Sequence, residues 1–456
     1  MPRHFGIRPH LRYSVAVFSP HGAGWQRGGL SPHFNVCRDF PTCFLWFWIR
    51  EAARLVLMNK QPFTVPPRRW ESQLSPFLFR LFRPWRNRTL RRTQRITDIQ
   101  VEGAEIVQEA LKAGKGVLIT PNHSFHYDSY VLFEAAHRIG SPCHVLTAWQ
   151  VFGMSSPFER WMLQKHGCFS IDREGVDLRA FKQAVEFVKA SPHPLVIFPE
   201  GDIYHTNDRL TPFRDGAAAI ALSAAKRATR PIVCIPTAIK ARYVGDPTVK
   251  LQELMTRLEQ RLCWKPRKHQ PLAERLLEFS RGILSLKELE YVGEVRSGAI
   301  PDRVRELSSS ILTRIARQHG IEEKSTFVPE RVKEMRRHHI QKLQGPELPA
   351  DEQQRLERDF DDLFFVVQLF SYPGDYVAEN PTIERIAETL DKFEEDVLDG
   401  FYPTVRGERQ ATVRFGTPIE VPKEANKNTG LDDLTKQLER GVQSLLDEIN
   451  TSRKQT

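Results

Sequence analysis

The chain lacks any apolar run long enough to cross a bilayer as a helix, which needs about 20 residues. Its longest candidate, CFLWFWI at 43–49, is followed at once by Arg50 and Glu51. The first 42 residues also lack the basic-then-apolar order of a secretory signal. We therefore expect neither a membrane-spanning helix nor a cleaved leader.

Cysteine is scarce, with six residues scattered along the chain and no C-x-x-C pair. This pattern gives no disulfide framework or zinc knuckle and fits a reducing compartment. Lysine is missing from the first 59 residues, although residues 1–57 hold seven arginines. We interpret residues 1–57 as disordered, or as an extension upstream of a true start at Met58. A basic, aromatic membrane-contacting arm is the alternative.

Acidic residues are few at the N-terminal end. Residues 1–100 hold 17 arginines and lysines against four acids, so the other 356 residues are net acidic although the whole chain carries +10. The segment 68–95 alone has nine arginines and one acid, interleaved with tryptophan, phenylalanine and leucine. Ser75 and Pro76 predict a helix start, and Pro84 predicts its end. The net acidic remainder argues against nucleic-acid binding.

Arginines and aromatic residues crowded around a short apolar helix are typical of a segment that lies on an anionic membrane surface. We predict this role for residues 58–97, with the contact made through 68–95, and expect a peripheral protein on the cytoplasmic side of a membrane. The alternative is a helix packed on the body of the protein, with its arginines in solvent.

From about residue 100 the pattern alternates between short apolar runs and helical stretches. The runs are GVLIT (116–120), CHVLTA (143–148), PLVIFP (194–199) and PIVCIPTAI (231–239), and helices are expected around 128–139, 176–190 and 215–228. This alternation predicts an α/β domain over 98–249, with a mostly parallel sheet flanked by helices. Residues 250–405 predict a helical module, inserted or appended, and 406–456 a strand and helix that return to the α/β domain.

The loop after the first predicted strand, PNHSFHYDSY (121–130), concentrates polar chemistry. His123, His126 and Asp128 have the side chains of a metal site but not the spacing of a known one, so no metal is predicted. Asp128 alone reads as a helix cap. A third interpretation, after the metal site and the helix cap, is that Asp128 accepts a hydrogen bond from His123 Nδ1–H, which leaves Nε2 to act as a general base.

Four blocks in order resemble one family. NHSFHYD, the GCFSIDREG stretch (167–175), FPEG (198–201) and the proline-containing strand VCIPTAIK (233–240) resemble the glycerolipid acyltransferases, including the 1-acylglycerol-3-phosphate acyltransferases. The resemblance covers about 98–245 and 411–450. It implies the family's α/β fold and acyl transfer to a lipid hydroxyl.

The resemblance also implies roles for particular residues. His123 would be the catalytic base and Asp128 its orienting partner. Three residues would belong to the acceptor site: Arg173, Glu200 and Gly201. The family's usual arginine after FPEG is replaced by Ile203, so Arg209 or Arg214 would supply that charge, or the acceptor would be less anionic.

These inferences together predict an O-acyltransferase of phospholipid biosynthesis that uses no cofactor. The donor would be acyl-CoA or acyl-carrier protein, and the acceptor a lysophospholipid-type glycerol phosphate. The alternatives are another acceptor, such as glycerol-3-phosphate or an amino- or hydroxy-lipid, and a non-catalytic lipid-binding protein. A metal-dependent hydrolase using His123, His126 and Asp128 is a further alternative.

Overall fold

The structure is a computed structural model that describes residues 67–173, 175, 177–345, 348–398, 403–424 and 429–452. The predicted extension at 1–57 lies outside the described residues. Of the predicted membrane-surface segment, residues 67–97 are described.

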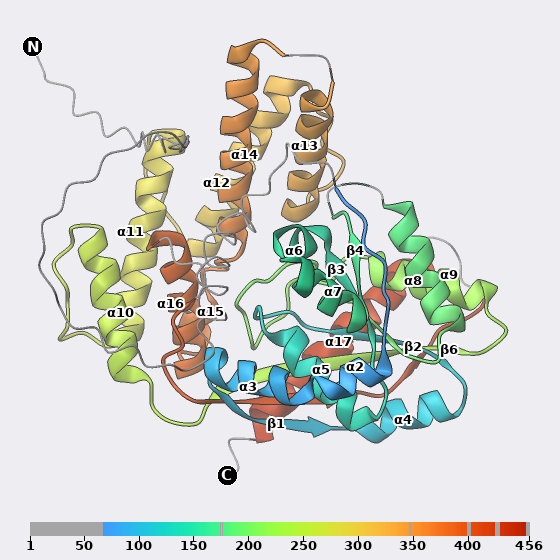
Figure 1. The fold of residues 1–456 in the computed structure, drawn as a ribbon. Helices are drawn as coiled ribbons and strands as arrows, with labels where there is room; N and C mark the ends of the chain where they lie inside the picture. The colour runs from blue at the N-terminus through green and yellow to red at the C-terminus, as the bar shows by residue number, and fades with distance from the viewer. Residues whose placement is uncertain are drawn as a thin grey trace, which may run out of the picture. The chain divides into compact units, whose positions relative to one another are not determined.

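A mixed sheet forms the centre of the α/β region (Figure 1). Its order in the described residues is β1-β7-β6-β2-β5-β3-β4, and β8 pairs with β6. All pairs are parallel except those of β6 with β7 and β8, which confirms the predicted, mostly parallel sheet. The strands are β1 (Ile96–Glu102), β2 (Gly116–Pro121), β3 (His144–Ala148), β4 (Cys168–Ile171), β5 (Leu195–Val196), β6 (Ile232–Tyr243), β7 (Arg409–Phe415) and β8 (Ile419–Glu420).

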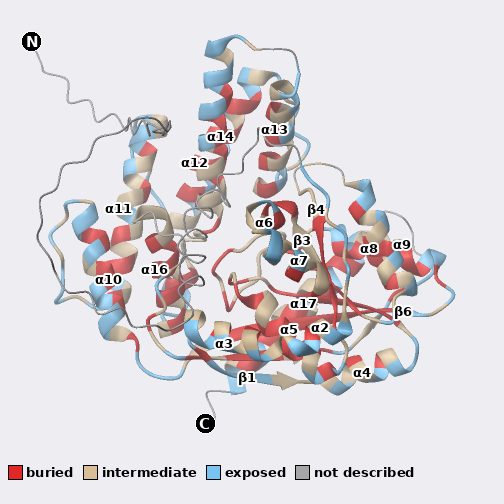
Figure 2. Ribbon diagram, in the orientation of Figure 1, coloured by how far each residue is buried: buried red, intermediate tan, exposed pale blue. Residues whose placement is uncertain are grey.

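Strand β2 is buried on both faces, as its unbroken apolar run requires. Val117 and Ile119 belong to one core cluster and Leu118 to another, because successive side chains of a strand point to opposite faces. The first cluster includes residues of α2 (Pro76–Leu81), α3 (Arg83–Gln94), α4 (Ala104–Lys112) and α5 (Asp128–Ile139). The second includes residues of α8 (Leu178–Ala190), α9 (Gly216–Arg227) and α17 (Thr429–Ser452). Figure 2 shows the resulting buried strands between helices with exposed outer faces.

Two local predictions differ from the structure. Ser75 caps α2 and Pro76 is its first residue, as predicted, but Pro84 does not end the helical run. It lies in the first turn of α3, where its missing N–H costs nothing. The run PLVIFP forms a strand only at Leu195–Val196, between its two prolines. Two further short helices, α6 (Trp149–Met154) and α7 (Pro157–Lys165), lie between β3 and β4.

Helices α10 to α16 fill the region between β6 and β7. They are α10 (Thr248–Arg261), α11 (Leu272–Val292), α12 (Ile300–His319), α13 (Val328–Leu343), α14 (Ala350–Phe370), α15 (Tyr376–Glu379) and α16 (Ile383–Val397). One apolar cluster joins α10, α11, α15 and α16, and another joins α11, α12, α13 and α14. We call these helices the helical module. Gly320, with φ of 63°, ends α12 in the left-handed conformation that glycine favours.

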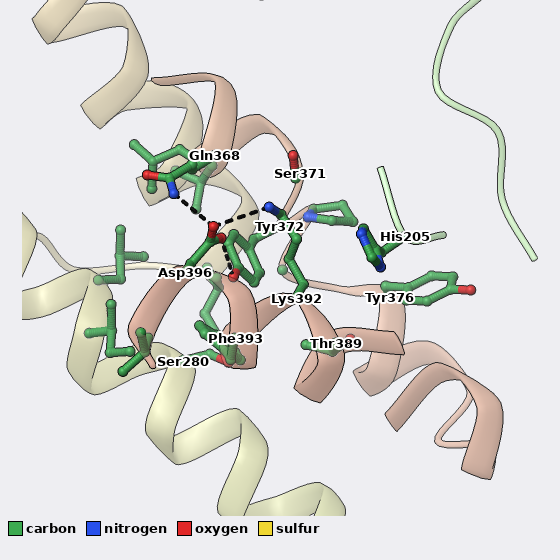
Figure 3. A pocket seen from close by; sticks show the side chains of 18 of the residues that line it. His205, Ser280, Gln368, Ser371, Tyr372, Tyr376, Thr389, Lys392, Phe393 and Asp396 are labelled. Carbon is green, nitrogen blue, oxygen red and sulfur yellow. Dashed lines mark hydrogen bonds and ion pairs between the residues drawn. The ribbon is translucent and has the colours of Figure 1, made fainter. Parts of the chain in front are cut away.

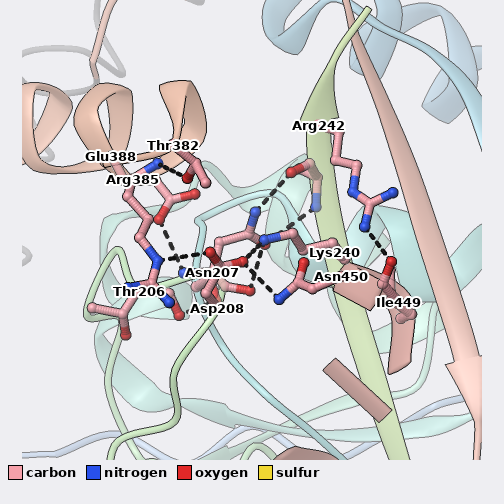
Figure 4. Close-up of polar contacts among 12 residues, drawn as sticks. Thr206, Asn207, Asp208, Lys240, Arg242, Thr382, Arg385, Glu388, Ile449 and Asn450 are labelled. Carbon is pink, nitrogen blue, oxygen red and sulfur yellow. Dashed lines mark hydrogen bonds and ion pairs between the residues drawn. The ribbon is translucent and has the colours of Figure 1, made fainter. Parts of the chain in front are cut away.

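Buried ion pairs connect the module to the sheet (Figure 4). Lys240 of β6 is 2% exposed and pairs with Asp208, which also accepts a hydrogen bond from Arg385 of α16 at 2.8 Å. Glu388 of α16 accepts hydrogen bonds from the Asn207 backbone N–H (3.2 Å) and the Tyr376 hydroxyl (2.6 Å). Burial lowers the Lys240 pKa to about 8, against the raising effect of nearby carboxylates. The network therefore fixes α16 to the loop that follows the FPEG block.

We predict that Lys240→Met lowers the free energy of unfolding by about 3–5 kcal/mol, because it leaves buried carboxylates without their cation. Urea unfolding followed by circular dichroism measures the change. Lys436→Met, which removes an exposed pair with Asp432, is the control and should leave stability unchanged. Equal stability of the Lys240→Met and wild-type proteins would contradict a structural role for this network.

Candidate active site

The loop after β2 is held in place by Asn122. Its side-chain oxygen accepts from the Ile239 N–H at 2.7 Å, and its amide donates to the Ile239 carbonyl at 3.0 Å. The side chain thus bonds β6 as a further strand residue would, and it is fully buried. These two hydrogen bonds to the main chain of β6 fix the backbone immediately before His123.

His123 and Asp128 face each other across the loop. Nδ1 of His123 lies 3.0 Å from Asp128 Oδ2, which also accepts the backbone N–H groups of Ser124 and Phe125, each at 2.8 Å. Asp128 is fully buried, whereas the His123 side chain is 19% exposed and stacks on Phe198 with ring centroids 4.1 Å apart. Asp128 therefore accepts a hydrogen bond from His123 Nδ1–H, and in this tautomer Nε2 keeps a free lone pair.

The helix-cap reading of Asp128 differs from the structure. The N-cap of α5 is Tyr127, which makes no side-chain cap bond, and Asp128 is the first helical residue. The carboxylate turns back to the loop, where it accepts the bonds from Ser124, Phe125 and His123. Its bonds therefore organise the loop that carries the imidazole.

Glu200 of the FPEG block lies directly behind this loop. Oε1 accepts the His123 backbone N–H at 2.6 Å, and Oε2 accepts the Thr211 backbone N–H at 2.9 Å. Burial raises the Glu200 pKa to about 8, although both backbone donors oppose the shift. Glu200 was predicted as an acceptor-site residue; the structure places it against the backbone of His123, where it positions the loop.

A cationic pocket is lined by Gly201, the residue after Glu200. Arg173 donates to the Gly201 carbonyl at 2.9 Å, and Arg214 lies so close that a Cβ on Gly201 would stand 2.7 Å from its Nε. Gly201 also has φ of 77°, a conformation that favours glycine, and a Cβ here would displace the Arg214 side chain. The pocket, of about 30 Å³, is also lined by Lys333 and Arg336 of α13. We call these four cations and the space between them the arginine pocket.

Asp202 and Ile203 follow FPEG directly, and Ile203 stands where the family usually has an arginine. Asp202 also lines the arginine pocket, and Arg173 Nη1 lies 3.5 Å from its carboxylate. Burial raises the Asp202 pKa, but Arg173 and Arg214 outweigh it and hold the pKa below its ordinary value. The Ile203 N–H donates to Asp202 Oδ1 at 3.0 Å.

The two arginines predicted to replace the missing charge have different surroundings. Arg214 lines the arginine pocket beside Arg173. Arg209 instead pairs with Asp375 at 2.5 Å and with Glu379 of α15 at 3.5 Å. The structure therefore brings Arg214, and not Arg209, to the pocket that follows FPEG.

Two groups among the described residues have metal-ligating atoms close together: His126 with His205 and Glu395, and His319 with His339 and Asp359. The His126 and His205 Nε2 atoms lie 3.7 and 3.4 Å from the Glu395 carboxylate. Burial would raise the Glu395 pKa, but these two histidines hold it well below its ordinary value. Because His126 faces Glu395, the trio His123, His126 and Asp128 is not assembled as a ligand set.

Sequence reasoning missed four contributors to this site. Asn122 and Phe198 stand inside recognised motifs, but their bonds to β6 and to the imidazole are not readable from spacing. Lys333 and Arg336 lie on α13, more than a hundred residues after FPEG, and nothing in their local sequence indicates the site.

Comparison with known proteins identifies the class of this region. A family model described as Acyltransferase matches residues 98–240, which run from β1 to β6 and carry all four blocks. No curated protein matches the chain in sequence.

The resemblance to the glycerolipid acyltransferases is thereby confirmed for this part of the chain. The match supports acyl transfer to a lipid acceptor as the general activity. Helices α10 to α17 lie outside the matched residues.

We predict a pH signature for Glu200. Its folded pKa of about 8 exceeds the ordinary value, so the folded protein holds a proton that the unfolded chain releases at lower pH. Its contribution to stability is fully present below about pH 4.5 and is lost as pH rises through about 8. The wild type should therefore lose stability across this window relative to Glu200→Gln, which does not titrate; urea unfolding at several pH values measures the difference.

Glu200→Gln should also lower the stability of the fold at every pH. A glutamine amide can accept only one of the two backbone N–H groups, which leaves a buried donor unsatisfied at about 1–3 kcal/mol. Parallel stability profiles for the two proteins between pH 5 and 8 would contradict the raised pKa.

Proposed function

We propose that the protein transfers a fatty acyl group from the thioester of acyl-CoA or acyl-carrier protein to a hydroxyl of a glycerol-phosphate-type lipid, with His123 as general base. The observation that carries this proposal is the 3.0 Å contact between a partly exposed His123 and a fully buried Asp128. It gives the imidazole one tautomer and one direction, which base catalysis requires.

The proposed reaction needs no covalent enzyme intermediate. His123 Nε2 removes the proton from the acceptor hydroxyl while the oxygen attacks the thioester carbonyl. The tetrahedral intermediate collapses with formation of the ester and cleavage of the C–S bond. The thiol leaves with the proton held by the imidazolium, and Asp128 stabilises that cation throughout.

The acceptor proposal rests on the arginine pocket. Guanidinium groups match phosphate oxygens in charge and geometry, and Arg173, Arg214 and Arg336 converge here with Lys333. Asp202 cancels one of these charges, so the pocket suits a phosphate monoester or diester better than several phosphates. A lysophospholipid-type acceptor fits best, and glycerol-3-phosphate is the second candidate; an amino- or hydroxy-lipid would leave the pocket unused.

We predict that His123→Ala and Asp128→Asn each reduce the rate of acyl transfer by about 10²–10⁴-fold, because one removes the base and the other its tautomer control. Transfer of labelled acyl groups from CoA and carrier-protein donors to a panel of glycerol-based acceptors measures the loss. The exposed His269 lies outside this site, and His269→Ala is the matched control.

The outcomes are distinct. Full activity of His123→Ala would refute the base, and lipid binding without transfer by the wild type would favour the lipid-binding alternative. Transfer only to acceptors without phosphate would refute the role of the arginine pocket.

We also propose that residues 68–95 hold this site at a membrane surface. Phe77 and Leu81 on α2 are 71% and 56% exposed, and the exposed arginines of the segment include Arg80, Arg88 and Arg91. Other arginines there are structural: Arg83 pairs with Glu134, and Arg86 donates to the Phe79 carbonyl. Among the described residues, no helix has the length and apolar character to span a bilayer.

We predict that the protein binds anionic phosphatidylglycerol vesicles and that salt weakens the binding, because the screening length falls from about 10 Å at 0.1 M to about 3 Å at 1 M. The double variant Phe77→Ser, Leu81→Ser should bind about tenfold more weakly, through loss of apolar insertion. Vesicle co-sedimentation measures both effects.

Leu178→Ser removes a leucine of α8 that is 60% exposed, on the other face of the sheet, and is the control. Equal binding by the double variant and this control would contradict the proposed surface, as would binding that does not respond to salt.

A further inference from the structure

The helical module encloses a cavity of about 540 Å³ (Figure 3). This volume lies within the roughly 300–1,000 Å³ of small-molecule sites. Its walls are built mainly from apolar side chains of four helices, α11, α12, α14 and α16; these include Leu276, Ile283, Leu284, Val304, Phe365 and Phe393. The family match does not extend to these helices.

Several polar groups in this cavity bond one another. Asp396 accepts hydrogen bonds from Gln368 (2.7 Å), Tyr372 (2.7 Å) and Lys392 (3.2 Å), as Figure 3 shows. Lys287, also in the wall, pairs with Glu290 at 2.8 Å. Since both lysines are neutralised by the protein, the chemistry of the wall favours an uncharged, apolar ligand.

One end of the cavity reaches the candidate active site. Tyr204, His205 and Thr206, which follow FPEG, line it, and Tyr204 also lines the arginine pocket. The Thr206 carbonyl accepts a hydrogen bond from Ser124 beside His123. The cavity is therefore lined by Thr206, which bonds the loop of the proposed base, and by Tyr204, which also lines the proposed phosphate site.

We propose that this cavity binds one fatty acyl chain of the substrates. The inference rests on the proposed function and deepens it, because it assigns the helical module a part in selecting the lipid. An amphiphile presents an anionic head and an apolar tail, and the structure offers a cationic pocket and an apolar cavity that share Tyr204. The chain belongs either to the thioester donor or to the lipid acceptor.

A binding experiment tests the cavity without any acyl transfer. Ser280 of α11 and Thr389 of α16 line it, and their hydroxyls donate to carbonyls of their own helices, at Leu276 and Arg385. Ser280→Phe and Thr389→Phe should each fill part of the cavity and weaken binding of the fluorescent fatty acid cis-parinaric acid by tenfold or more. Arg281→Phe, on the exposed face of α11, is the matched control and should bind as the wild type does.

A second experiment identifies the source of the chain. Donor chain length is varied with a fixed acceptor, and acceptor chain length with a fixed donor. Each methylene that no longer fits in the cavity should lower kcat/KM about fourfold. The filled variants should therefore prefer shorter chains in one series only. A shift in the donor series assigns the cavity to the donor, and a shift in the acceptor series to the acceptor.

Folding of each variant is checked by circular dichroism. Undiminished probe binding by both folded, filled variants would overturn the proposal, as would unchanged chain-length preference in both series. Probe binding that Ser280→Phe abolishes, in a protein without transferase activity, would uphold the cavity and refute the proposed reaction.

Discussion

The arrangement of the candidate site depends on the Asp128 carboxylate. One oxygen accepts hydrogen bonds from two loop N–H groups and from His123 Nδ1–H, so a single buried side chain shapes the loop and aims the base. Glu200 holds the same loop from behind, through the backbone of His123. Loop shape and base orientation are therefore not independent features: a change that disturbs one carboxylate disturbs both. This coupling explains why two motifs 77 residues apart meet at one histidine.

The sequence predicted what local spacing controls. Unbroken apolar runs identified the buried strands, and the five-residue step from His123 to Asp128 is short enough to close within one loop. Ser75 and Pro76 placed the start of α2 for the same reason. Pro84 was misread because a proline that interrupts one helix is equally suited to the first turn of the next. Its role depends on whether Phe82 and Arg83 turn the chain, which local pattern does not specify.

Contacts between distant segments could not be predicted. Arg209 and Arg214 stand five residues apart in one motif, yet one faces α15 and the other the arginine pocket, because the intervening loop separates them. Arg336 reaches that pocket only through the packing of α13 against α12 and α14. The cavity of the module likewise arises from how four helices pack, and the sequence pattern of a single helix does not predict it.

The bonds of two asparagines to β6 have a mechanical consequence. Asn122 pairs with the main chain of Ile239, and Asn207 pairs in the same way with Ala241, two residues further along the strand. The loop that carries His123 and the loop after FPEG are therefore hydrogen-bonded to nearby positions of β6. Because both loops are bonded to one strand, that strand sets the spacing between the imidazole and the cationic pocket.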